Sequence, residues 1–104
     1  MAELNLITCI VQRGKADKLI KAAMDAGAQG ATSFYARGTG VRQKLGVLGL
    51  FIQPEKEVIM IAARPEETDA IFNALVSTGK LDRPGLGFAF VSKIDKAIGL
   101  MEKK

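Results

Sequence analysis

The chain has 104 residues, which is enough for one domain with a single hydrophobic core, so we expect residues 1–104 to form one domain. Apolar residues make up 48% and charged residues 25%, a balance that excludes a disordered chain. The net charge of +4 suits anionic ligands but is too small for a nucleic-acid-binding arm.

The cysteine content and the longest apolar runs indicate the compartment. Cys9, the single cysteine, lies in an apolar run where a buried thiol is expected rather than a reactive one. One cysteine gives no disulfide framework, which favours the cytoplasm. No apolar run approaches the ~20 residues of a membrane span, and residues 1–3 lack the basic segment of a signal peptide. We expect a cytoplasmic protein that is neither secreted nor membrane-spanning.

Two strand-like segments flank a helical one in the first half of the chain. In residues 4–12, both the odd-numbered and the even-numbered positions are mostly apolar. Because these two sets point to opposite faces of a strand, the pattern predicts a strand that is covered on two faces. In residues 15–24, apolar side chains recur with a helical period, and Gly27 then offers a C-cap. Residues 31–36 contain threonine, phenylalanine and tyrosine, which favour a second strand.

The second half repeats this order. Residues 58–63 are continuously apolar and predict a third strand that starts at about residue 57. Pro65 suits the first position of a helix, acidic residues follow it, and Gly79 should end that helix. Residues 88–93 predict a fourth strand, and residues 94–101 predict a short strand or a helical tail.

The order strand, helix, strand, strand, helix, strand indicates the fold class. It is typical of the α+β ferredoxin-like fold, a double split-βαβ whose antiparallel sheet carries both helices on one face. The first and third strands carry apolar side chains on both of their faces, so the sheet face without helices should also be covered. We therefore predict an oligomer packed through its sheets.

Two glycine-rich basic loops form the candidate ligand site. Glycine lets backbone N–H groups wrap phosphate oxygens, while arginine and lysine neutralise the charge. The alternative is that the glycines are ordinary turn residues and the cations solvated surface charge, which is how we interpret Lys15, Lys18 and Lys21. The expected phosphate-binding residues are Gly38, Thr39, Gly40, Arg42, Gln43, Thr78, Gly79, Lys80, Arg83, Gly85 and Gly87.

Catalytic chemistry has little support in the sequence. The chain has no histidine, one cysteine and no Gly-x-Ser-x-Gly motif, which removes most nucleophilic and metal-hydrolytic mechanisms. A transition-metal site would lack imidazole and a cysteine cluster. The paired glutamates at 55/57 and 66/67 are explained by a solvated turn and a helix start. We expect neither an enzyme nor a metal site.

Both loops resemble those of the PII signal-transduction family, and more specifically its PII-like branch. Residues 38–44, Gly-Thr-Gly-Val-Arg-Gln-Lys, are similar to the Gly-x-Gly-Arg-Gln-Lys that opens the family's T-loop, with one valine added. Pro54 ahead of the third strand, and Thr-Gly-Lys at residues 78–80, similar to the start of the B-loop, extend the resemblance to nearly the whole chain.

The resemblance implies a homotrimer of ferredoxin-like subunits. Such a trimer binds AMP, ADP or ATP, with or without Mg²⁺, in clefts between subunits and needs no other cofactor. It regulates nitrogen or carbon metabolism when the T-loop, here residues 44–53, contacts a target such as a membrane transporter or a metabolic enzyme. The expected target-contacting residues are Lys44, Leu45, Gly46, Val47, Leu48, Gly49, Leu50 and Phe51.

The chain departs from the family pattern in three places. Its T-loop is shorter and lacks the tyrosine that is uridylylated in the usual family members. Arg83 stands in for a B-loop lysine, and Gly99 and Met101 occupy positions of phosphate-contacting arginines. These changes leave open which nucleotide binds and whether 2-oxoglutarate is sensed.

Two other functions stay open. The first is a ferredoxin-like trimer that binds a small ligand or a metal, as in ACT-like or CutA-like proteins; the absence of histidine argues against the metal. The second is an RNA-binding module, although residues 58–63 contain no aromatic side chain on which a base could stack.

Overall fold

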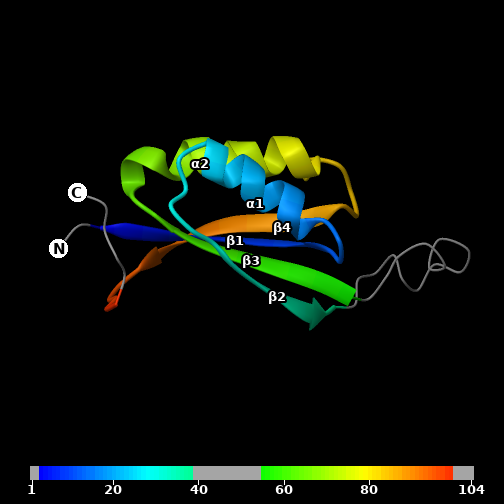
Figure 1. Ribbon diagram of the computed structural model, residues 1–104, viewed down its shortest axis with the longest axis horizontal. Coiled ribbons are helices and arrows are strands. Elements are labelled where there is room, and N and C mark those ends of the chain that lie inside the picture. The colour runs from blue at the N-terminus through cyan, green and yellow to red at the C-terminus, as the bar shows by residue number, and fades with distance from the viewer. Residues whose placement is uncertain (1–2, 39–54, 100–104) are drawn as a thin grey trace, which may run out of the picture.

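The computed structural model describes residues 3–38 and 55–99. Its elements are β1 (Leu4–Gln12), α1 (Ala16–Asp25), β2 (Thr32–Arg37), β3 (Glu55–Ala63), α2 (Pro65–Gly79) and β4 (Gly87–Ile94). The strands form one antiparallel sheet in the order β2-β3-β1-β4, and both helices cover one face of it (Figure 1). The predicted ferredoxin-like α+β fold is confirmed.

The predicted and observed segments differ at two ends. β3 begins at Glu55 because residues 55–57 pair with the second half of β2, which their polar side chains do not reveal. The predicted strand or helix over residues 94–101 is wrong for residues 95–99, which form neither. Ile94 pairs with Leu4, the first residue of β1, so β4 has no partner strand beyond that point. In the described part of the chain, neither helix has the length and apolar character needed to cross a bilayer.

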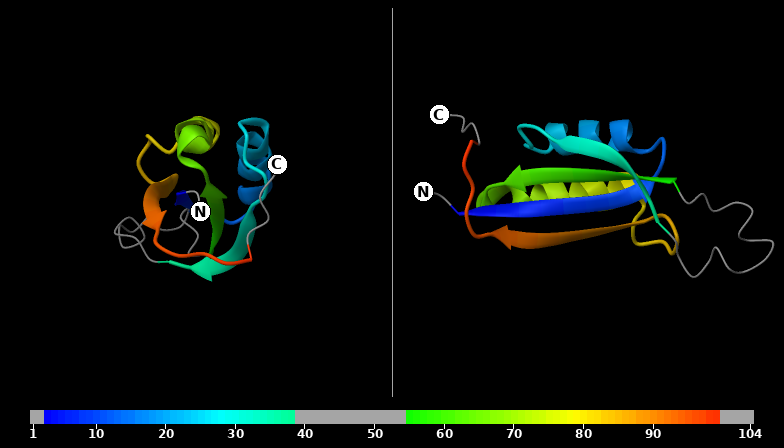
Figure 2. Two further views of the ribbon diagram at one scale, coloured as in Figure 1. Left: turned by 90° about the vertical axis from the view of Figure 1, so that its left-hand side faces the viewer. Right: turned by 90° about the horizontal axis from the view of Figure 1, so that it is seen from below.

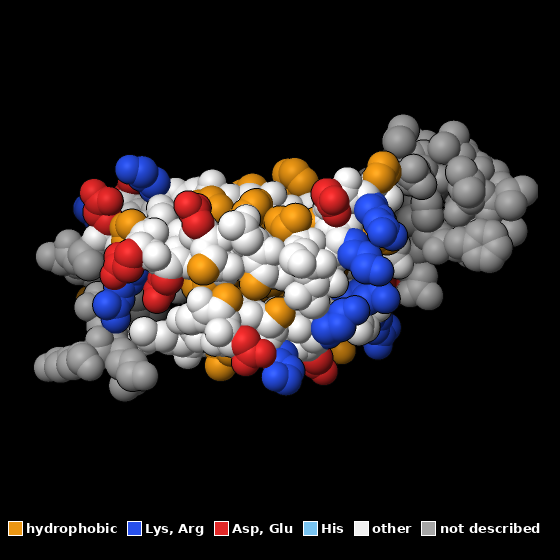
Figure 3. All heavy atoms as spheres, turned by 90° about the horizontal axis from the view of Figure 1, so that it is seen from above, with side chains coloured by type: hydrophobic (Ala, Val, Ile, Leu, Met, Phe, Trp, Pro, Cys, Tyr) orange, Lys and Arg blue, Asp and Glu red, His pale blue; other side chains and the backbone are white. Residues whose placement is uncertain are grey.

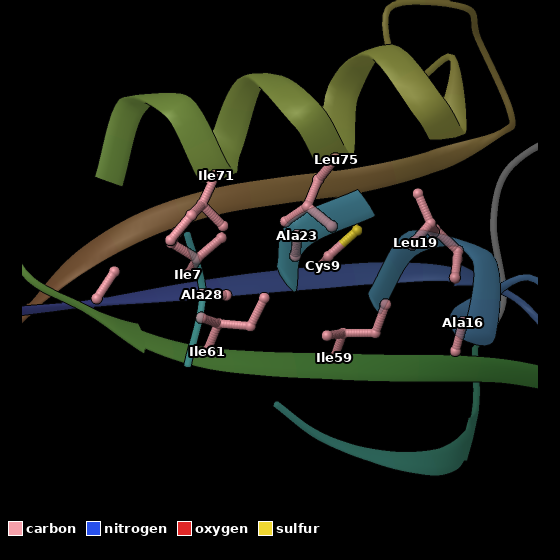
Figure 4. Close-up of a cluster of buried hydrophobic side chains, with 12 residues drawn as sticks. Ile7, Cys9, Ala16, Leu19, Ala23, Ala28, Ile59, Ile61, Ile71 and Leu75 are labelled. Carbon is pink, nitrogen blue, oxygen red and sulfur yellow. The ribbon is translucent and has the colours of Figure 1, made fainter. Parts of the chain in front are cut away.

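The hydrophobic core lies between the helices and the sheet. Cys9 pairs with Ile59 across β1 and β3, and both side chains are fully buried. Helical side chains cover this pair from above (Figure 4). The centre of the core consists of Ile7, Cys9, Leu19, Ala23, Ile59, Ile61, Ile71 and Leu75. The prediction that Cys9 is a buried residue is confirmed.

Burial of Cys9 should make the protein sensitive to alkali. Burial raises the pKa of its thiol from 9.0 to about 11, whereas the unfolded thiol still ionises near its ordinary value. The neutral thiol makes its full contribution to the free energy of unfolding below pH 9, and this contribution is lost as the pH rises towards 11. At pH 10 the free energy of unfolding is lower by about 1.4 kcal/mol. Urea unfolding at pH 8 and pH 10 measures it. Cys9→Ala should lose less stability over this interval, and equal losses would contradict the prediction.

The start of α1 is capped by a side chain from β3. The N-cap residue Lys15 has no side-chain acceptor, and Oε1 of Glu57 instead accepts hydrogen bonds from the N–H groups of Gly14 (2.8 Å) and Ala16 (3.1 Å). The carboxylate also lies at the positive end of the helix dipole. This contact fixes the first turn of α1 against the sheet.

We expect Glu57→Ala to lower the free energy of unfolding by about 1–2 kcal/mol, because two N–H groups lose their acceptor. Glu57→Gln keeps an oxygen acceptor and should lose less. Glu55→Ala, which removes the same charge from an exposed position of β3, should stay within about 0.5 kcal/mol of the wild type. Chemical denaturation compares the three variants, and equal stabilities of Glu57→Ala and Glu55→Ala would rule out the cap.

Within residues 3–38 and 55–99, the other face of the sheet carries no helix (Figure 2). In-register pairing aligns side chains across all four strands on this face, with Phe34 beside Val58, Val58 beside Ile10 and Ile10 beside Phe88. Phe34 is 47% exposed and Phe88 61% exposed. We define the open face as Ile10, Phe34, Val58, Met60, Phe88 and Phe90. In the described part of the chain, this apolar face therefore exposes the aromatic side chains of its edge strands, as the sequence predicts, whereas Val58 between them is only 9% exposed.

Candidate functional site

Two hollows lie on either side of the loop between α2 and β4, at the end of the molecule where α1 begins. The helical-side hollow, of about 460 Å³, has polar walls made by Gln12, Lys15, Lys18, Thr78, Lys80 and Arg83. The sheet-side hollow, of about 210 Å³, is lined by Ile10, Lys56, Gly85, Gly87 and Phe88 among others. Val11, Gln12 and Leu86 line both. Lysine and arginine side chains gather at this end of the helical face (Figure 3).

The structure divides the predicted site residues between these hollows. Thr78, Gly79, Lys80 and Arg83 line the helical-side hollow, whereas Gly85 and Gly87 line the sheet-side hollow. Gly38 follows the last residue of β2, at the opposite edge of the sheet. The remaining predicted residues, Thr39, Gly40, Arg42, Gln43 and the target-contacting residues 44–51, lie outside the described residues.

Gly38, the one described residue of the first loop, lies nearer to the sheet-side hollow than to the helical-side one. β2 and β4 are the sheet edges, so three strand spacings place Gly38, at the end of β2, about 14 Å from the start of β4. Lys56 spans part of this gap, because a Cβ on Gly38 would lie 3.5 Å from Cγ of Lys56, which also lines the sheet-side hollow. Lys56 therefore lies between Gly38 and the sheet-side hollow.

The backbone of the second loop is largely hydrogen-bonded to itself. α2 ends in a Schellman motif, in which the Leu81 N–H donates to Val76 O (3.0 Å) and the Lys80 N–H donates to Ser77 O (3.4 Å). The Arg83 N–H donates to the carbonyl of Lys80 (3.0 Å). These N–H groups are not available to wrap a phosphate, so side chains must hold an anion in the helical-side hollow.

Close packing favours glycine at two positions of this segment and requires it at Gly87. A Cβ on Gly79 would lie 3.0 Å from Cδ2 of Leu81 and 3.1 Å from Cδ2 of Leu19. A Cβ on Gly87 would lie 2.6 Å from Cδ2 of Leu81 and 2.9 Å from the carbonyl oxygen of Ile10. The glycine pattern from which the sequence predicts a phosphate loop therefore has a structural cause at these two positions.

Lys80 adopts a left-handed conformation, with φ 54° and ψ 45°, directly after α2. It is the one non-glycine residue with positive φ in the described part of the chain, and it occupies the C′ position where glycine is usual. A side chain there costs roughly 1–2 kcal/mol, part of which the α2 dipole returns by attracting the ammonium group. Because a lysine in this conformation lowers stability, we expect its charge to have a role.

Lys80→Gly should therefore raise the free energy of unfolding by about 0.5–1 kcal/mol, because glycine adopts this conformation without strain. Lys80→Ala removes the charge but keeps the strain, so it should show no gain. Calorimetric melting compares the two variants. A Lys80→Gly variant less stable than Lys80→Ala would show that the conformation is not strained.

Three lysines that line the two hollows are not among the site residues predicted from the sequence. Lys56 lines the sheet-side hollow, and Lys15 and Lys18, interpreted above as solvated charge, line the helical-side hollow. The predicted topology contained the missing signal, because a split-βαβ order runs the two helices antiparallel and places the start of α1 beside the end of α2.

Other parts of the described chain add nothing to this site. No group of three or more histidine, cysteine, aspartate or glutamate residues within residues 3–38 and 55–99 could hold a metal ion. A hollow of about 590 Å³ near Leu4, Ile94 and Ile98 has none of the predicted site residues in its described lining.

Comparison with known proteins identifies the family. The family model for nitrogen regulatory protein P-II matches residues 4–104. No curated protein sequence matches the chain. The solved structures that match it include Arabidopsis thaliana PII bound to citrate, with a TM-score of 0.66 and 18% sequence identity over 86% of this chain and 76% of that chain. The structural likeness shows a shared fold, and the family match covers nearly every residue, so this chain belongs to the nitrogen regulatory protein P-II family.

Proposed function

We propose that this chain is a non-enzymatic regulator that binds an adenine nucleotide between the subunits of a homotrimer. AMP, ADP or ATP is the effector, and residues 44–53 contact a target of nitrogen or carbon metabolism, such as a transporter or an enzyme. Membership of the P-II family supports the regulatory role.

The observation that carries the proposal is that the sheet-side hollow adjoins the open face. Ile10 and Phe88 belong both to the open face and to the lining of this hollow. A second subunit seated on the open face would border the hollow and shield it from water. A nucleotide in that cleft would reach Gly85 and Gly87 directly, and Gly38 across Lys56.

The open face also supports the homotrimer. Phe34, Phe88 and Phe90 are 47%, 61% and 39% exposed in one chain, and they flank the aliphatic side chains of β1 and β3. An apolar patch that crosses a whole sheet is rarely left in water. Further copies of the same chain are its simplest cover, and a closed ring of three gives every copy the same contacts.

An anionic ligand is consistent with the charge at this end of the molecule. The P-II structure from Arabidopsis thaliana holds citrate, a small polyanion. For this chain we propose that the nucleotide acts by binding one arrangement of residues 44–53 more tightly than another, so that occupancy decides which surface the target meets.

Titration calorimetry with AMP, ADP and ATP tests the proposal. We expect one nucleotide per chain and an affinity that falls at least tenfold, about 1.4 kcal/mol, in Arg42→Ala. Lys93→Ala removes the same charge from an exposed position of β4 and should bind normally. Absence of heat with all three nucleotides, or equal affinities of Arg42→Ala and the wild type, would reject the nucleotide site.

RNA binding is the second candidate, because Phe34, Phe88 and Phe90 expose aromatic rings on the open face. These rings lie on the edge strands, whereas the central strands present Ile10 and Val58. A gel-shift assay with single-stranded RNA distinguishes the candidates. A strong salt-dependent shift together with no nucleotide binding would favour the RNA module.

A further inference from the structure

The helical-side hollow gathers four cations from two separate parts of the chain. Lys15 and Lys18 come from the start of α1, whereas Lys80 and Arg83 follow the end of α2. No aspartate or glutamate of the described chain lines the hollow, although Asp17 and Asp82 are sequence neighbours of two of these residues. The hollow is therefore a concentration of one sign of charge.

These four cations form no ion pair with any residue of the described segments. The ion pairs within those segments include Lys21 with Asp25 at 3.3 Å and Arg64 with Glu66 at 3.9 Å, both away from the hollow. Apolar walls from Val11, Leu19 and Leu86 lie beneath the charges. A concave surface of one charge sign with low-dielectric walls concentrates the electric field and raises the local concentration of counter-ions.

The described lining of the hollow comes from one subunit and is separate from the proposed nucleotide cleft. Val11, Gln12 and Leu86 contribute to both hollows and form the wall between them. Its volume of about 460 Å³ exceeds what a single phosphate occupies. Three ammonium groups, one guanidinium fork and the Thr78 hydroxyl provide more donors than one phosphate can use, and they suit several linked phosphates.

We propose that the helical-side hollow binds a small polyanion with two or more linked phosphate groups, held by Lys15, Lys18, Lys80, Arg83 and Thr78. The ligand is a free polyphosphate, because the wall formed by Val11, Gln12 and Leu86 separates this hollow from the proposed nucleotide cleft. This site does not depend on a second subunit, and it does not depend on the proposed nucleotide cleft.

Calorimetry of the full chain with sodium tripolyphosphate tests the site. We expect one ion per chain and a clear loss of affinity when the salt concentration is raised. Lys15→Ala/Lys18→Ala should weaken binding at least tenfold. The matched control, Lys21→Ala/Lys93→Ala, removes two exposed lysines that do not line the hollow and should bind as the wild type does. Arg83→Gln removes a cation from the wall opposite Lys15 and Lys18 and so tests that wall independently.

Backbone amide shifts in NMR spectra locate the bound ion. Tripolyphosphate should shift the amides of residues 78–83 and of Lys15, and leave Gly38 unchanged. No binding, equal losses in both double variants, or shifts confined to Gly38 and Gly85 would overturn the proposal.

Nucleotide titrations separate this site from the proposed nucleotide cleft. If Lys15→Ala/Lys18→Ala leaves the affinities for ATP and AMP unchanged, the hollow is a separate site for a free polyphosphate. If the double variant weakens ATP but not AMP, the hollow belongs to the nucleotide site and the proposal is overturned. Tripolyphosphate binding without any nucleotide binding would reject the proposed function and leave this site intact.

Discussion

Replacing Gly87 with alanine should lower the free energy of unfolding by about 3 kcal/mol, mainly because the new Cβ overlaps its neighbours. The new Cβ would lie 2.6 Å from Cδ2 of Leu81, 2.9 Å from the carbonyl oxygen of Ile10 and 3.0 Å from Cγ1 of Val11. The leucine can rotate away, but the carbonyl belongs to the backbone of β1. Relief therefore requires β4 to shift along or away from its partner strand.

Gly30→Ala is the matched control for this prediction. A Cβ on Gly30 would meet no atom within 4 Å, so the change should stay within about 0.5 kcal/mol of the wild type. Leu81 packs against the core, so Gly87→Ala is also measured in a Leu81→Ala background. There the closest contact is gone but the overlap with Ile10 remains, so Gly87→Ala should cost less than in the wild type without becoming neutral. Denaturant titrations give the stabilities of all these variants. Equal stabilities of Gly87→Ala and Gly30→Ala would contradict the close approach.

The order of elements was predictable because each segment carries a local signal that agrees with the fold. Residues 4–12 match β1 at both ends, and Gly27, with φ 121°, accepts the left-handed position that closes α1. Pro65 opens α2, where Oε1 of Glu67 accepts a hydrogen bond from the Arg64 N–H at 3.0 Å. Only signals of this local kind can be read without knowing which strands pair.

The features that the sequence did not reveal depend on contacts between distant segments. Glu57 is polar and looks like part of a turn, yet it caps a helix that starts 41 positions earlier. Lys15 and Lys18 resemble solvated lysines until the fold sets them beside Lys80. Glycine is ambiguous for a different reason, because close packing and phosphate binding favour the same residue. Gly79 and Gly87 therefore fitted the phosphate-loop prediction, although close packing already favours glycine at position 79 and requires it at position 87.

Phe34→Asp should dissociate the proposed trimer while leaving the single chain folded. Phe34 lies on the open face and is 47% exposed in one chain, so a carboxylate there stays hydrated in a monomer. In the assembly each copy would bury that charge against apolar side chains. We expect a penalty of at least about 3 kcal/mol per interface, which is more than a hundredfold in each association constant.

Tyr35→Asp is the matched control, because Tyr35 is the next residue of the same strand, points to the opposite face and is 67% exposed. Sedimentation velocity should give a trimer for the wild type and for Tyr35→Asp, and a monomer for Phe34→Asp. If the nucleotide cleft is built from two subunits, Phe34→Asp should also lose nucleotide binding, while tripolyphosphate still binds because the described lining of the helical-side hollow comes from one chain. A wild type that sediments as a monomer, or a Phe34→Asp trimer, would remove the open face as the subunit interface and the sheet-side cleft with it.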